Sequence, residues 1–75
     1  MLLVTTPDRY IKADDGTIIS LDENNNISIE YVGNTHITIL NRVNGKLEGQ
    51  IPPLYKEEVL LFNELINYHE EKGDL

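Results

Sequence analysis

The sequence predicts a small α+β domain: an antiparallel sheet of about four to five short strands, joined by hairpins, followed by one C-terminal amphipathic helix packed on one face. Three observations support this fold class. Apolar and polar residues alternate over the first two thirds of the chain, turn-forming residues separate these segments, and the last third has helical periodicity. Seventy-five residues without a repeat or linker fit a single α+β domain over residues 1–75.

The first hairpin is predicted from two short segments, residues 9–12 and residues 17–22. Both carry isoleucine or leucine among polar residues, as a half-buried strand does. Asp15 and Gly16 lie between them and favour a tight reversal of the chain with positive φ. We therefore expect the sheet to begin with this pair of strands.

The stretch LDENNNISIE, residues 21–30, places two acids and three asparagines in succession, which raises the question of a calcium loop. An EF-hand loop beginning at Asp22 needs glycine at its sixth position and a bidentate glutamate at its twelfth. Those positions hold Ile27 and Gly33. Asparagine readily adopts the left-handed conformation, so residues 23–26 are interpreted as a β-hairpin loop and no metal site is expected.

Two further strands are expected at residues 27–31 and 36–43, where apolar and polar residues alternate regularly. Asn44 and Gly45 then favour a two-residue type I′ turn, because both central residues of that turn need positive φ. The expected partner strand covers residues 46–51.

This hairpin register makes the predicted sheet apolar on both sides, because a two-residue loop fixes which residues lie opposite each other. One face then carries Leu40, Leu47 and Ile51, and the other carries Ile37, Ile39 and Val43. Either a bulge near Gly49 shifts the register, or the helix covers one face and a neighbouring chain covers the other. The sequence leaves these two alternatives open.

The helix is expected over residues 54–72, after Pro52 and Pro53, which suit a first helical turn. Gly73 follows where a left-handed cap is expected. The apolar residues of the predicted helix form two adjacent stripes, with Leu60 outside both. One stripe consists of Tyr55, Val59, Phe62 and Ile66, and the other of Leu61, Leu65 and Tyr68. Together they exceed the ~100° arc that a helix on one sheet requires, which predicts a second packing surface against another subunit.

The sequence contains no recognisable catalytic or metal-binding constellation. There is no cysteine, and His36 and His69 have no Cys, His or Asp nearby at metal-ligand spacing; His69 is expected to be exposed near the helix end. Glu57 and Glu58 point about 100° apart on a helix, so they cannot act on one substrate together. We therefore expect a protein that is not an enzyme, with no catalytic residues, no cofactor and no metal.

Thirteen acidic against six basic residues give a net charge of −7, which disfavours direct binding to nucleic acid or to anionic membranes. The same charge favours a basic protein partner. No stretch has the roughly 18 apolar residues of a membrane span, and the first ten residues lack the features of a signal peptide. The expected location is the cytoplasm.

These observations predict a small acidic accessory or regulatory protein that acts by protein–protein binding. Its size and charge resemble those of phage- or prophage-encoded proteins, which is analogy alone. The alternative is an acidic mimic of nucleic acid that inhibits a DNA- or RNA-binding enzyme. A homodimer is expected, because the surplus apolar surface would otherwise face water. The candidate interface residues are Leu40, Leu47, Ile51, Leu60, Leu61, Leu65 and Tyr68.

Overall fold

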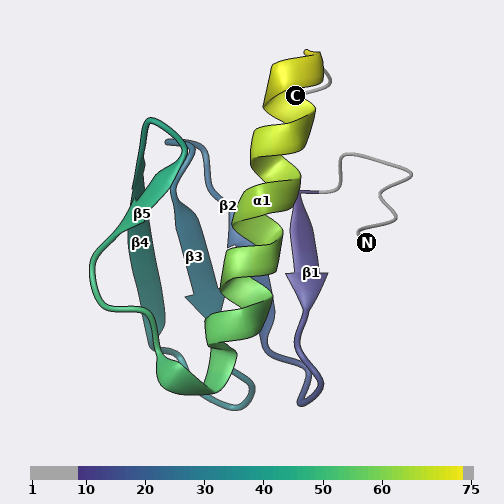
Figure 1. The fold of residues 1–75 in the computed structure, drawn as a ribbon. Helices are drawn as coiled ribbons and strands as arrows, with labels where there is room; N and C mark the ends of the chain where they lie inside the picture. Colours follow the sequence, from purple (N-terminus) through teal and green to yellow (C-terminus); the bar gives the residue numbers. More distant parts are fainter. Residues whose placement is uncertain (1–8, 74–75) are drawn as a thin grey trace.

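The structure is a computed structural model that describes residues 9–73. It contains one antiparallel sheet with a long helix lying across one face (Figure 1). The strands lie side by side in chain order, which is the arrangement that successive hairpins produce. The elements are β1 (Tyr10–Lys12), β2 (Ile18–Leu21), β3 (Ile27–Glu30), β4 (Ile37–Val43), β5 (Lys46–Glu48), the 3-10 turn η1 (Pro53–Tyr55) and α1 (Lys56–Lys72). The predicted α+β fold is confirmed.

The loops between the first three strands follow the turn chemistry of their residues. Gly16 has a φ of +92° in the β1–β2 loop, as the Asp-Gly pair predicts. In the β2–β3 loop the carboxylate of Asp22 accepts backbone N–H bonds from Asn24 (2.9 Å) and Asn26 (2.8 Å), while Asn25 has a φ of +63°. The interpretation of the asparagine stretch as a hairpin loop is therefore confirmed. The carboxylate of Asp22 stabilises the loop through these hydrogen bonds to its backbone.

The β4–β5 hairpin has the register that a two-residue turn requires. Val43 lies opposite Lys46, and the two turn residues, Asn44 and Gly45, have φ values of +54° and +80°. Both values are positive, as a type I′ turn demands. The predicted turn and its register are confirmed.

Strand β5 is shorter than the sequence predicts. It ends at Glu48 rather than at residue 51, because Gly49 has a φ of +107° and turns the chain out of the sheet. No bulge shifts the register of this hairpin, so the first of the two alternatives is wrong. The sheet has apolar residues on both faces.

The helical segment begins and ends at the predicted signals. Pro52 accepts the N–H of Tyr55 through its carbonyl oxygen, which closes the 3-10 turn before α1. Gly73, with a φ of +77°, caps the helix and donates its N–H to the carbonyl oxygen of Glu70 at 3.1 Å. Among the described residues, no helix is long and apolar enough to cross a membrane.

The core lies between the sheet and the helix. Each of its members is less than a tenth exposed, and burying a large apolar side chain of this kind contributes ~1.5–3 kcal/mol. The first predicted stripe contributes Tyr55 from η1 and Val59, Phe62 and Ile66 from α1, and the strands contribute Ile19, Leu21, Ile27, Ile29 and Leu40. His69 is also buried, contrary to the expectation of an exposed histidine, and its ring contacts Tyr68 edge-on at 5.3 Å.

Candidate protein interface

The cross-strand register determines which sheet face the helix covers. Ile27 of β3 lies opposite Leu40 of β4 and opposite Leu21 of β2, and directly opposed residues point to the same face. All three are core residues packed with the helix. The face that carries Leu40 is therefore the inner face, and the odd-numbered residues of β4 lie on the outer face.

The outer face of the sheet exposes a group of aliphatic side chains on β4. Ile37, Ile39 and Val43 are 50%, 57% and 46% exposed, although all three belong to the most apolar residue types. Tyr10 of β1 lies on the same face and is exposed as well. Contiguous apolar surface on a small protein commonly marks a binding site.

The outer face also carries charges, and they balance. Lys12 and Glu30 lie in one cross-strand row, and Lys46 and Glu48 lie on β5. Between them the hydroxyl groups of Ser20 and Ser28 are 3.1 Å apart and share a hydrogen bond. Because the whole chain carries a net charge of −7, this face is far less acidic than the rest of the molecule.

The structure corrects one part of the predicted interface. Leu40, Leu47 and Ile51 were expected on a face that the helix does not cover, but Leu40 is only 2% exposed within the core. Leu47 and Ile51 are partly buried and pack against that core. The prediction chose the wrong face of the sheet, since the helix covers these residues and leaves the isoleucines of β4 uncovered.

The remaining predicted residues lie on the helix. Leu60, Leu61 and Tyr68 are exposed and Leu65 is half-buried. The helix therefore presents apolar side chains outside its core stripe, as its wide apolar arc predicts. They are separated by Glu64, which is exposed, so the helix surface is more mixed than the outer face of β4.

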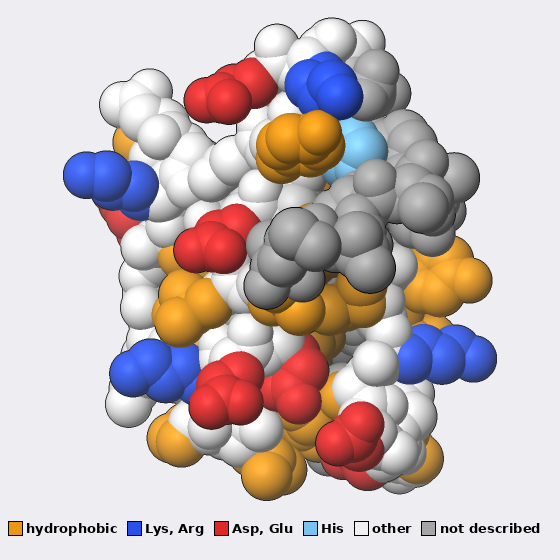
Figure 2. Space-filling view, turned by 45° about the vertical axis from the view of Figure 1, so that its right-hand side comes forward, with side chains coloured by type: hydrophobic (Ala, Val, Ile, Leu, Met, Phe, Trp, Pro, Cys, Tyr) orange, Lys and Arg blue, Asp and Glu red, His pale blue; other side chains and the backbone are white. Residues whose placement is uncertain are grey.

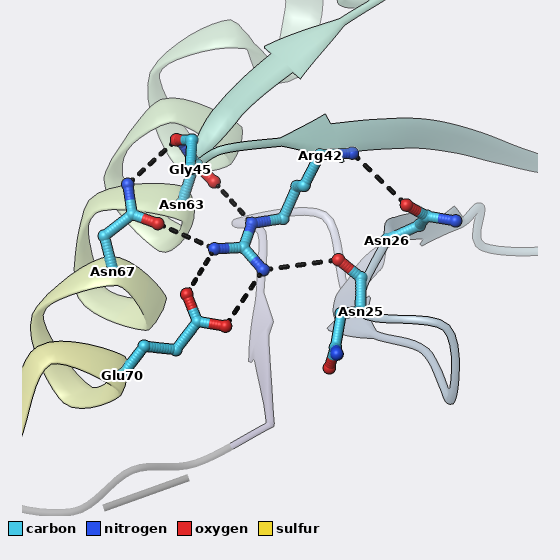
Figure 3. A network of polar contacts seen from close by, with 7 residues as sticks. All are labelled: Asn25, Asn26, Arg42, Gly45, Asn63, Asn67 and Glu70. Carbon is cyan, nitrogen blue, oxygen red and sulfur yellow. Dashed lines mark hydrogen bonds and ion pairs between the residues drawn. The ribbon is translucent and has the colours of Figure 1, made fainter. Parts of the chain in front are cut away.

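A network around Arg42 explains why a charged residue can lie on the inner face (Figure 3). Its side chain is only 4% exposed and forms an ion pair with Glu70 of α1 at 2.7 Å. Its Nε donates to Oδ1 of Asn63 at 2.9 Å, and its Nη2 donates to Oδ1 of Asn67 at 2.6 Å. The carbonyl oxygen of Asn25 accepts a further bond from Nη1 at 3.2 Å.

The same two helix asparagines also hold the β4–β5 turn. Asn63 and Asn67 each donate from Nδ2 to the carbonyl oxygen of Gly45 at 2.9 Å. The network thus connects the β2–β3 loop, the β4–β5 hairpin and the helix through polar groups alone. It fixes the inner face against α1, which leaves the opposite face of β4 directed to the outside.

A second polar cluster joins the β1–β2 loop to the start of the helical segment. The hydroxyl of Tyr55 donates to Oδ2 of Asp15 at 2.6 Å and lies 3.1 Å from Oγ1 of Thr17, whose backbone N–H donates to Oδ1 of Asp15 at 2.9 Å. The tyrosine hydroxyl, followed by that backbone N–H, lowers the pKa of Asp15 below its ordinary 3.8. The same hydrogen bond raises the pKa of Tyr55 above its ordinary 10.0.

The polar groups of both clusters bond to other groups of the protein. The Arg42 guanidinium is occupied by protein groups, and the open hollow beside it, about 380 Å³, is lined by amides and by Glu70 and Glu71. A hollow of about 150 Å³ adjoins Asp15 and Tyr55. Over the part of the chain that the structure describes, no three His, Cys, Asp or Glu side chains are grouped to hold a metal ion.

Comparison with protein-family models, curated proteins and solved structures finds no match for this chain. The functional assignment therefore depends on the surface itself. Sequence reasoning placed Ile37, Ile39 and Val43 on one face but missed that this is the face left uncovered. The available signal was the alternation in β3, since Ile27 and Ile29 can join the core only if Leu40 joins it too.

Proposed function

We propose that this protein is a small accessory or regulatory protein that acts by binding another protein through the outer face of its sheet. The observation that carries the proposal is the exposure of Ile37, Ile39 and Val43 on β4, opposite the helix. These side chains gain ~25 cal/mol for each Å² of apolar surface that a partner removes from water. The acidic and basic side chains around them balance, so this face does not repel a partner surface that is neutral or of mixed charge.

A binding experiment with matched variants tests this proposal. Ile39→Lys adds a charge among the exposed aliphatic side chains of β4, whereas Leu60→Lys adds the same charge at an exposed leucine of the helix. Proteins captured from a lysate of the source cell by immobilised wild type are identified by mass spectrometry. We expect a specific partner to be lost with Ile39→Lys and retained with Leu60→Lys.

The opposite pattern would contradict the proposal. A partner that is lost with Leu60→Lys and retained with Ile39→Lys would place the binding surface on the helix. Circular dichroism melts of both variants establish that each is folded before the comparison is made.

The second candidate function is an acidic mimic that occupies a basic, nucleic-acid-binding groove. Glu57, Glu64 and Glu71 favour it, because they are exposed and recur every seven residues on one side of α1. On the face drawn in Figure 2, however, Asp and Glu side chains are scattered among hydrophobic, Lys and Arg side chains rather than gathered in a continuous patch. Capture at low and then raised salt separates the two functions, since a partner of the mimic is released by salt.

A further inference from the structure

Strand β4 extends beyond its neighbour β5 and leaves part of its edge unpaired. β5 pairs only with residues 41–43 of β4, whereas residues 37–40 pair with β3 on the other side. In Figure 1, β5 lies beside the upper part of β4 only. Among residues 9–73, no strand pairs with the remaining edge of β4.

The backbone groups on this free edge belong to Ile37 and Ile39. The carbonyl oxygen of Asn26 accepts the N–H of Asp22 at 2.8 Å, so the backbone of Asn26 faces β2. Backbone groups alternate in direction along a strand, so the N–H and C=O groups of Ile27 face β4. Those of Leu40, which lies opposite Ile27, face β3. The alternate residues, Ile37 and Ile39, therefore direct N–H and C=O to the open side.

A second hydrogen bond gives the same direction. Arg42 donates its backbone N–H to Oδ1 of Asn26 at 3.2 Å, so even-numbered residues of β4 face the β3 side. Within the described part of the chain, no hydrogen bond engages the outward backbone groups of Ile37 and Ile39. Unpaired edge groups of this kind are a template for another strand.

The other free edges of the sheet carry the charges that usually prevent such pairing. β1 carries Lys12, and β5 carries Lys46 and Glu48, all exposed. The free segment of β4 reads Ile-Thr-Ile over residues 37–39, without a charge or a proline. Charged residues and prolines at edges block association, so this uncharged segment leaves the edge able to pair with another strand.

We propose that this edge binds a second copy of the same chain, with the two β4 strands antiparallel about a twofold axis at Thr38. This proposal rests on the proposed function, in which the β4 surface, formed by Ile37, Ile39 and Val43, is a binding surface. In this pairing Ile37 of one copy lies opposite Ile39 of the other, and each pair exchanges its backbone N–H···O=C bonds. Ile-Thr-Ile reads the same in both directions, which is the self-complementarity that a twofold interface requires.

The pairing also brings the exposed isoleucines of both copies together on the outer face. Directly opposed β-branched side chains contact each other across an antiparallel pair, so Ile37 and Ile39 lose much of their exposed apolar surface. The segment carries no charge, whereas the chain as a whole carries −7. The association is therefore weak at low ionic strength, where the two copies repel, and becomes tighter as salt screens that repulsion.

Sedimentation equilibrium of the full chain over a range of concentrations tests the proposal. The wild type is expected to dimerise, with a dissociation constant that falls when salt is raised from about 50 to about 500 mM. Ile39→Lys should weaken dimerisation roughly tenfold or more, because a twofold interface contains every substitution twice. Ile37→Lys should have the same effect and serves as the second variant if the first does not fold.

Val43→Lys is the matched control, because Val43 lies on the same face and strand but next to β5, where the edge is already paired. Its dissociation constant should stay within about twofold of the wild type, below the effect of a lost contact. An 8.6 kDa monomer at millimolar concentration and high salt overturns the proposal. So does a dimer that both isoleucine variants leave intact, or one that Val43→Lys weakens equally, since that pattern indicates face-to-face packing.

The result also separates this inference from the proposed function. If the chain stays monomeric while Ile39→Lys still abolishes capture of a different protein, the pairing of two copies is wrong and the binding role of the β4 surface stands. If the dimer forms and Ile39→Lys retains every other partner, the pairing stands and the accessory function through this surface is wrong.

Discussion

Replacing Arg42 by methionine should destabilise the fold more than any substitution on the outer face. Methionine keeps an unbranched apolar chain in place of the arginine stem but removes every donor of the guanidinium. The Oδ1 atoms of Asn63 and Asn67 then lose the bonds of 2.9 and 2.6 Å that they accept from it. Glu70 loses its ion pair.

The size of the effect follows from how deeply each partner is buried. A buried polar atom left without a partner costs ~1–3 kcal/mol. Asn63 is buried and takes most of that penalty, Asn67 is half-buried, and Glu70 is 40% exposed and regains water. The sum is about 3 kcal/mol, against a total stability of roughly 4–11 kcal/mol for a domain of this size. The melting temperature should fall by about 15 °C.

Urea unfolding followed by circular dichroism measures this loss directly. Glu70→Gln, which keeps an acceptor but removes the charge, should cost about 1 kcal/mol, because half-exposed ion pairs contribute little. Glu71→Gln, at the adjacent exposed position, is the control and should change stability by less than ~0.5 kcal/mol. If Arg42→Met unfolds at the same urea concentration as the wild type, the network does not stabilise the fold and the reasoning is wrong.

Three further predictions concern the loops. The folded-state pKa of Asp15 lies below 3.8, so its stabilisation is complete above roughly pH 5 and is lost as pH falls through the folded pKa; Asp15→Asn should flatten the acid limb of the unfolding free energy measured against pH. Gly45→Ala forces a side chain into positive φ and places its Cβ 3.1 Å from Oδ1 of Asn67, so it should lower stability by ~1–2 kcal/mol and by more than Gly33→Ala, which has open space, when both are unfolded in urea. Millimolar calcium should leave the melting temperature unchanged, because the carboxylate of Asp22 already accepts two backbone N–H bonds; a rise of several degrees would contradict this.

The sequence was sufficient for most of the fold, because each strand is bounded by residues with strong turn preferences. Asn44 and Gly45 predicted both the turn and its register, and Gly73 predicted the end of the helix. The end of β5 was missed, since Gly49 can continue a strand or leave it, and only the path of the chain toward the helix decides between them.

The uncovered face of the sheet could not be assigned in the same way. Both faces of the last hairpin are apolar in sequence, and the face of Leu40 also carries the charged Arg42. That face became the core because Asn63 and Asn67, nine and five residues before the end of α1, supply acceptors for the buried guanidinium. Such a network depends on side-chain positions that no periodicity encodes.

Amide hydrogen exchange at single-residue resolution, followed by NMR from dilute to millimolar protein, tests most directly whether the β4 edge binds another strand. We expect the N–H groups of Ile37 and Ile39 to exchange rapidly in dilute protein and to slow down together as the concentration rises. Thr38 and Leu40, whose N–H groups face β3, should be protected throughout. Rapid exchange of Ile37 and Ile39 at every concentration, or protection that does not depend on concentration, would contradict the pairing of two β4 strands.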